Sequence, residues 1–124
     1  MARTEPLTIV LEGERPDSIN QFYAGMNYYH RTRVVKRAKE RLIAELLVME
    51  VPRDPFRGPV SITMTAYFDR NQMDASNLML KMYEDALKGW VLIDDTPKYV
   101  PMVTLISAVD KRRPRVEIEV VPLA

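Results

Sequence analysis

The stretch GPVSITMTAYF, residues 58–68, constrains the fold more than any other part of the chain. Its apolar side chains recur at every second position, at Val60, Ile62, Met64, Ala66 and Phe68. A period of two places these side chains on one face of an extended strand, which is the pattern of a strand buried on that face only. Such a strand needs neighbouring strands and a layer that covers its apolar face.

Three further segments predict strands, although their alternation is shorter. In PLTIVLEGERP the apolar residues alternate from Leu7 to Leu11, and Gly13 and Pro16 end the strand. Near the carboxyl end, MVTLISAV and RVEIEVV each predict a strand. The residues DKRRP, 110–114, lie between them, and this order predicts a β-hairpin.

A long amphipathic helix is predicted from about Thr32 to residue 50. Its apolar residues recur at helical spacing, at Val34, Val35, Ala38, Leu42, Ile43, Leu46 and Leu47. Pro52 and Pro55 end the helix and make the following connection rigid. The preceding stretch, residues 17–33, has no clean periodicity and predicts a polar and aromatic loop.

A second helix is predicted from about Ala75 to Lys88, because Asp74 is a favourable N-cap and Gly89 a favourable terminator. Residues seven or eleven apart return to nearly the same face of a helix. One polar stripe along this helix therefore contains Asp74, Asn77, Lys81 and Asp85. A lysine and an aspartate four residues apart are also an ordinary pair on a solvated helix. The stripe alone is therefore compatible with a functional site and with a solvated surface.

Two adjacent carboxylates, Asp94 and Asp95, follow the apolar run at residues 91–93. They repel each other unless a cation lies between them. Hard cations such as Mg²⁺ take oxygen ligands, and a bound Mg²⁺ activates water and stabilises charge at a phosphodiester. An acidic turn through Thr96 and Pro97 explains the same residues. Residue types alone leave the two interpretations open.

The order β-α-β-α-β-β predicts an α+β fold, in which two helices pack on one face of a mixed sheet. A chain of 124 residues forms a single domain, 1–124, around one core. The absence of cysteine excludes disulfides and zinc–thiolate sites and favours the reducing cytoplasm. No apolar run reaches the ~18 residues of a membrane span, so we expect no membrane partner.

The pattern D-x-x-N…K…D-A-L…G…(apolar)-D-D over residues 74–95 resembles the RusA-type Holliday-junction resolvases. The segment ERPDSINQFY, with Pro16, Asn20 and Tyr23, is similar to the opening loop of that family. The resemblance implies a homodimeric endonuclease of the kind often carried by prophages, acting in DNA recombination and repair. It implies hydrolysis of branched DNA, such as a four-way junction, with Mg²⁺ as cofactor and Mn²⁺ as a substitute.

Carried over residue by residue, the resemblance implies catalytic roles for Asp74, Lys81 and Asp95. Lys81 resembles the lysine that contacts the scissile phosphate. Asp74 and Asp95 would be the principal metal ligands, with Asp94 assisting. The supporting residues would be Asn20, Asn77 and Asp85.

Two positions depart from the family pattern. Ser76 stands where the family usually has an aspartate, and the spacing from Asn77 to Lys81 is one residue longer. These departures leave open a second interpretation, in which a catalytically impaired module on the same fold binds junctions without cleaving them. A more distant third is a small structural or regulatory protein with an acidic helix face.

A basic and aromatic stretch, residues 28–41, surrounds the start of the first long helix. Lysine and arginine neutralise phosphates, so we predict DNA contacts at Arg31, Arg33, Lys36 and Arg37. Nearby Tyr23, Tyr28 and Tyr29 are candidates for stacking on unpaired bases. A solvated helix face explains the same charges, and the basic tip DKRRPR is a second candidate surface. The methionines predict core filler, or a dimer surface if Met79 and Met82 are exposed.

Overall fold

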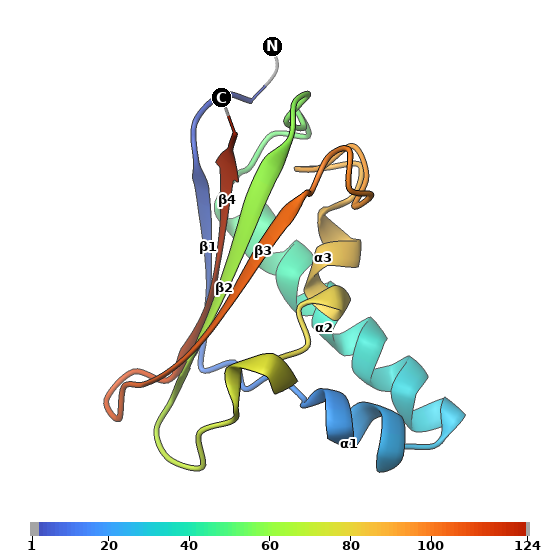
Figure 1. Cartoon of the computed structure of the whole chain (residues 1–124), viewed down its shortest axis with the longest axis vertical. Helices are drawn as coiled ribbons and strands as arrows, with labels where there is room; N and C mark the ends of the chain where they lie inside the picture. Colours follow the sequence, from blue (N-terminus) through green and yellow to red (C-terminus); the bar gives the residue numbers. More distant parts are fainter. Residues whose placement is uncertain (1–2, 124) are drawn as a thin grey trace.

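The structure is a computed structural model that describes residues 3–123. Four strands form one mixed sheet in the order β1-β4-β2-β3, and the helices lie on one of its faces (Figure 1). The predicted α+β architecture is therefore confirmed. The strands are β1 (Leu7–Glu12), β2 (Val60–Phe68), β3 (Met102–Val109) and β4 (Arg115–Pro122). The helices are α1 (Ile19–Ala24), α2 (Tyr28–Val48), the 3₁₀ turn η1 (Ala75–Asn77) and α3 (Lys81–Leu87).

The strand β2 lies inside the sheet and carries the alternation predicted from its sequence. Its five alternate apolar residues, from Val60 to Phe68, are at most 2% exposed. The buried face of α2 belongs to the same core and contributes side chains spaced four residues apart, Val34, Ala38, Leu42 and Leu46. None of the helices within residues 3–123 is long and apolar enough to span a membrane.

The predicted hairpin of β3 and β4 is wrong, because β2 lies between these strands. The chain from β2 crosses over through η1 and α3, and β3 then pairs parallel to β2 on its outer side. The strand β4 pairs antiparallel with both β2 and β1. Burial explains this order, since Val116, Ile118 and Val120 of β4 are fully buried whereas most of β3 is exposed. The strand with the regular buried alternation takes the interior position, although β3 has the more apolar composition.

The predicted loop over residues 17–33 is also wrong, because it contains α1 and the first residues of α2. Ser18 and Gln21 form a capping box that starts α1. The Asn27 side chain accepts the His30 N–H at 2.9 Å and starts α2 at Tyr28, four residues before the predicted start. These local caps, rather than an apolar stripe, define the helix ends.

The predicted continuous helix over residues 75–88 is interrupted after Asn77. Leu78 adopts an extended conformation (φ −72°, ψ 134°) and forms a β-bridge with Ser18, and α3 begins only at Lys81. Three consecutive apolar residues explain the break, since Leu78, Met79 and Leu80 are all buried. A helix cannot direct three successive side chains into the same core. Beyond α3, Gly89 takes a φ of +77°, which suits glycine as the predicted terminator.

Candidate active site

Two lysines and two aspartates form a compact ionic group at α3, which we call the lysine–aspartate cluster: Lys81, Lys88, Asp85 and Asp95. Both Lys81 Nζ and Lys88 Nζ lie 3.4 Å from Asp85 Oδ1. Lys88 Nζ lies 3.2 Å from Asp95 Oδ2, and Lys81 donates a hydrogen bond to the same oxygen. Each carboxylate is thus bracketed by two ammonium groups.

The segment after α3 returns Asp95 to the side of that helix. Gly89 N–H donates to the Leu92 carbonyl at 2.7 Å and Val91 N–H donates to the Leu87 carbonyl at 2.9 Å. The side chains of Trp90, Val91 and Leu92 are buried beneath this turn. An apolar run therefore anchors the turn, and the acid that follows it is held against α3.

Ion pairing shifts the pKa values of Asp95, Lys81 and Lys88 in the direction that keeps these three groups charged. The Lys81 ammonium donates to Asp95 and holds the pKa of that carboxyl well below its usual range. The same hydrogen bond raises the pKa of Lys81, and a hydrogen bond to Asp95 also raises the pKa of Lys88. The Asp95 side chain is only 12% exposed, whereas the Lys81 side chain is 58% exposed. A covered carboxylate is thus held by flexible lysines that reach solvent.

The helix break separates Asp74 from the stripe predicted for it. Asp74 precedes η1 and is exposed, and within residues 3–123 its carboxylate takes part in no hydrogen bond or ion pair. Asp94 Oδ1 accepts the backbone N–H of Asp95 at 2.8 Å, so this carboxylate bends back onto its own turn. Of the predicted polar stripe, Lys81 and Asp85 remain together.

The predicted supporting residues Asn20 and Asn77 are in contact. Asn77 Oδ1 accepts the backbone N–H of Asn20 at 3.1 Å, which joins the first turn of α1 to η1. The neighbouring bridge between Ser18 and Leu78 strengthens this junction. The contact uses the Asn77 side chain and only the backbone of Asn20.

In the described part of the chain, no three histidine, cysteine, aspartate or glutamate side chains are gathered in a group that could hold a metal ion. Mg²⁺ in proteins needs fewer, because one or two carboxylates complete its shell with water and substrate phosphate. Asp94 and Asp95 are adjacent carboxylates at a half-buried turn. The chemistry of this donor set therefore fits Mg²⁺.

The basic residues at the start of α2 are of two kinds, those exposed to solvent and one that faces the protein. Arg33, Lys36 and Arg37 belong to the exposed face, as predicted. Arg31 instead turns inward, where its guanidinium donates to the carbonyls of Phe22 at 2.9 Å and Tyr23 at 2.8 Å. Arg31 thus connects α2 to α1, and its Nε and Nη2 donors are engaged by the protein.

A shallow cavity of about 340 Å³ opens beside this helix, lined by Arg15, Asp17, His30, Arg33, Val34 and Arg37. Three arginines in one hollow favour an anion, and phosphate oxygens match their donors. Sequence reasoning missed Arg15, which stands just before Pro16 in the opening loop. Its isolated position among mixed charges gave no periodic signal.

A buried acid connects the cationic helix to α3. Tyr83 Oη donates to Glu14 Oε2 at 2.6 Å, and Arg37 Nη1 lies 3.4 Å from Glu14 Oε1. Burial, followed by this hydrogen bond, raises the pKa of Tyr83. Burial likewise raises the pKa of Glu84, which lies 3.7 Å from Lys81 Nζ. Sequence reasoning missed Glu14, Glu84 and Lys88, because each becomes significant only through a partner distant in sequence or by burial.

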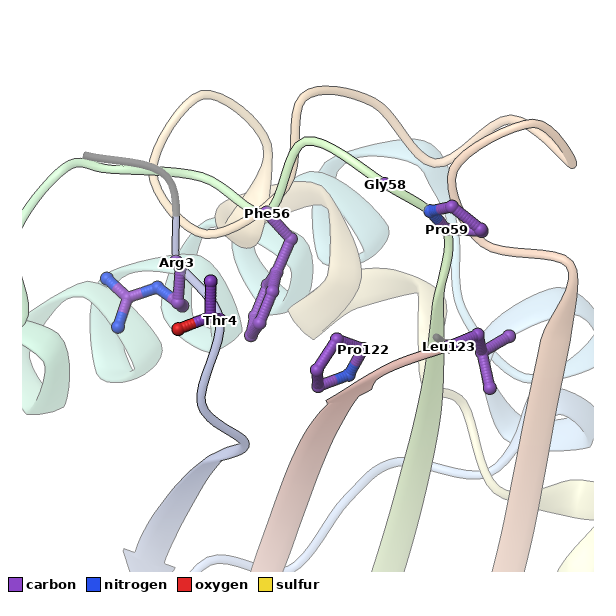
Figure 2. A pocket seen from close by; sticks show the side chains of 7 residues that line it. All are labelled: Arg3, Thr4, Phe56, Gly58, Pro59, Pro122 and Leu123. Atoms are coloured by element: carbon purple, nitrogen blue, oxygen red, sulfur yellow. The ribbon is translucent and has the colours of Figure 1, made fainter.

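A second cavity, of about 360 Å³, lies where β1 begins and β4 ends. Figure 2 shows the Phe56 ring projecting between Thr4 and Pro122 in this cavity. Its walls are largely apolar and include neither a carboxylate nor a lysine: Arg3, Thr4, Phe56, Gly58, Pro59, Pro122 and Leu123. The cavity is therefore separate from the lysine–aspartate cluster.

Comparison with known proteins gives one family match. The family model described as "Endodeoxyribonuclease RusA" matches residues 20–121. The match covers α1 from its second residue and all of α2, η1 and α3. It therefore includes both the lysine–aspartate cluster and the cationic start of α2. A search of curated proteins found no match.

Proposed function

Because the chain belongs to the RusA family of endodeoxyribonucleases, we propose that it is a Mg²⁺-dependent enzyme that resolves Holliday junctions. The observation that carries this proposal is the contact between Lys81 and Asp95. These residues lie on different elements, fourteen positions apart. They also match the lysine and the last aspartate of the family pattern. Cleavage of a synthetic four-way junction is the test.

In the proposed reaction, Asp94 and Asp95 would hold Mg²⁺, with water and substrate phosphate completing its shell. Asp74, which the structure does not gather with them, would have to join from η1. The ion, when bound, supplies an activated water and stabilises the charge that develops on the phosphate. Lys81 contributes a compact, flexible ammonium that follows a phosphate oxygen as its charge grows. Asp85 supports Lys81 from the same helix. The contact of Asn77 with Asn20 holds η1, and with it Asp74, against the first turn of α1.

The DNA backbone would lie along the cationic start of α2. Arg33, Lys36 and Arg37 are exposed there, and the arginine-lined cavity offers a place for one phosphate. Tyr28 and Tyr29 are about three-quarters exposed at the beginning of the same helix. Exposed rings beside cations favour unpaired bases near a branch point. Arg31 has a structural role in this scheme, because its guanidinium already binds α1.

We predict that Arg33→Ala with Lys36→Ala weakens junction binding and flattens its salt dependence. Each lost phosphate contact reduces the slope of log K against log salt by about 0.9. The fold should persist, because both positions are exposed and alanine favours helices. Binding measured by fluorescence anisotropy over a series of salt concentrations gives the slope. A control variant, Arg53→Ala with Arg57→Ala, removes the same charge elsewhere; equal slopes in the two variants would contradict the prediction.

A catalytically impaired junction-binding module is the second candidate, and Ser76 favours it. Ser76 is exposed in η1, where the family usually supplies a carboxylate. A hydroxyl is a weaker ligand for a hard cation than a carboxylate, so the site would hold Mg²⁺ less firmly. Junction binding without cleavage is the result that separates this candidate from the enzyme.

We further propose that the protein is a homodimer joined through β3. The alternative dimer surface is wrong, because Met79 and Met82 are buried. Among the strands of residues 3–123, β3 pairs only with β2, and its other edge is free. Its exposed apolar residues are Met102, Val103, Ile106 and Val109. The strand MVTLISAV contains no charged residue and no proline, the usual devices that prevent edge pairing.

Ile106→Lys is predicted to give a folded monomer. A charge in the middle of an exposed edge strand prevents pairing with a second copy, whereas β3 keeps its bonds to β2. Light scattering after gel filtration gives the mass, and circular dichroism reports the fold. Lys substitution of the exposed Val48 on α2 is the matched control and should leave the dimer intact. A monomeric wild type would contradict the proposal.

A further inference from the structure

The role of Lys88 is not explained by the family pattern, although Lys88 contacts the same carboxylate oxygen as Lys81. Its backbone follows the last residue of α3 and is extended (φ −62°, ψ 133°). The left-handed Gly89 then turns the chain toward Asp95. The end of α3 and the turn at Gly89 therefore place Lys88 beside Asp95.

Asp95 Oδ2 is fully engaged by ammonium groups in this arrangement. A Mg²⁺ ligand oxygen lies at about 2.0–2.1 Å from the ion. Two ammonium groups that hydrogen-bond the same oxygen would then stand beside a doubly charged cation, and like charges at such separations repel strongly. Lysines and metal therefore compete for this oxygen.

The two sides of the cluster differ in their freedom to move. Asp95 is 12% exposed and follows an anchored apolar turn, whereas the Lys81 and Lys88 side chains are 58% and 37% exposed. Lysine has a flexible four-carbon stem, so its ammonium can change partner without movement of the backbone. Asp85 Oδ1 lies 3.4 Å from both ammonium groups and remains available to them.

We propose that Lys81 and Lys88 are resident counter-ions of Asp95, which yield this carboxylate to the metal and thereby become available to the phosphate. The inference rests on the proposed function. It assigns Lys88 as a second cationic residue of the site, which acts on the same substrate group as Lys81. Both lysines then contribute twice, because they pair with the carboxylate in one arrangement and with the phosphate in the other.

The test measures Mn²⁺ affinity in the absence of DNA, through the electron paramagnetic resonance signal of free Mn²⁺. Methionine replaces lysine at similar length and without charge, in Lys81→Met, Lys88→Met and the double variant. We expect each single variant to bind Mn²⁺ at least five-fold more tightly than the wild type, and the double variant more tightly still. Lys39→Met removes the same charge from an exposed position of α2 and should bind as the wild type does.

A second measurement follows the lysines themselves. Acylation of amines, quantified by mass spectrometry, should be slow at Lys81 and Lys88 in metal-free protein and faster after Mg²⁺ is added. Lys39 should react at one rate in both conditions. Circular dichroism melting verifies that every variant is folded. If the double variant does not fold, either single variant still tests the inference.

The outcomes separate the inference from the function on which it rests. If the wild type binds Mn²⁺, Asp95→Asn does not, and the methionine variants match the wild type, the counter-ion role is wrong and the metal site stands. If Asp95→Asn binds Mn²⁺ as well as the wild type does, the assignment of Asp95 fails, and the counter-ion role fails with it. Tighter binding in Lys39→Met as well would show a general effect of net charge and overturn the inference.

Discussion

Asp95→Asn is expected to reduce junction cleavage about 10³-fold while the chain stays folded. A bound metal supplies several kcal/mol of stabilisation to the transition state, and each ~1.4 kcal/mol changes the rate tenfold. The substitution removes the charge that we propose holds the metal but keeps the shape of the side chain. Junction binding should be unchanged or tighter, since one carboxylate near the phosphates is lost. Cleavage rates under single-turnover conditions, with binding measured in parallel, provide the comparison.

Asp69→Asn is the matched control for this experiment. Asp69 is an exposed aspartate after β2 whose carboxylate accepts only the neighbouring Arg70 N–H in the described structure. The control changes net charge by the same amount and should cleave at the wild-type rate. Wild-type cleavage by Asp95→Asn, or an equal loss in both variants, would rule out a specific catalytic role for Asp95.

Tyr83→Phe is expected to produce the largest loss of stability among single-atom changes in this chain. Tyr83 is fully buried, and its hydroxyl donates to Glu14, which is itself 7% exposed. Removal of the hydroxyl leaves a buried carboxylate that, within residues 3–123, keeps only Arg37 as a side-chain partner. Such a loss costs about 1–3 kcal/mol. For a chain of this size the melting temperature should fall by about 4 °C for each kcal/mol.

Tyr29→Phe provides the control, because Tyr29 is 75% exposed and the same atom is removed from a solvated ring. Its melting temperature should stay within about 2 °C of the wild type, since exposed substitutions change stability by less than ~0.5 kcal/mol. Thermal melts followed by circular dichroism compare the two variants. Equal melting temperatures for Tyr83→Phe and the wild type would show that Glu14 gains nothing from this hydroxyl.

The parts of the fold that were predicted correctly have strong hydrophobic periodicity. In β2 and in α2 the apolar positions of the sequence are the positions that are buried, so the hydrophobic pattern alone identifies the element. The pairing of β3 and β4 was not predictable in this way. The residues of the turn between β3 and β4 favour a hairpin. Which strands pair is nevertheless decided by the packing of the whole sheet, and the sequence of one turn does not contain that information.

In the candidate site, too, contacts within one helix were predictable and contacts between elements were not. Lys81 and Asp85 were predicted together because four residues along a helix define their separation. The break at Leu78 separated Asp74 from them, since burial of three consecutive apolar residues outweighed helix continuity. Lys88 and Glu14 were missed, because their roles depend on a turn and on a buried contact between distant segments. Local spacing predicts neighbours within an element, whereas contacts between elements require the fold.

Cleavage of a labelled synthetic four-way junction by the wild-type protein tests the central claim most directly. The account predicts paired nicks that separate the junction into two duplexes when Mg²⁺ is present. It predicts no nicks after the metal is chelated, and none in a linear duplex of the same sequence. A junction that is bound but stays intact with both Mg²⁺ and Mn²⁺ would contradict the account and establish the binding module in its place.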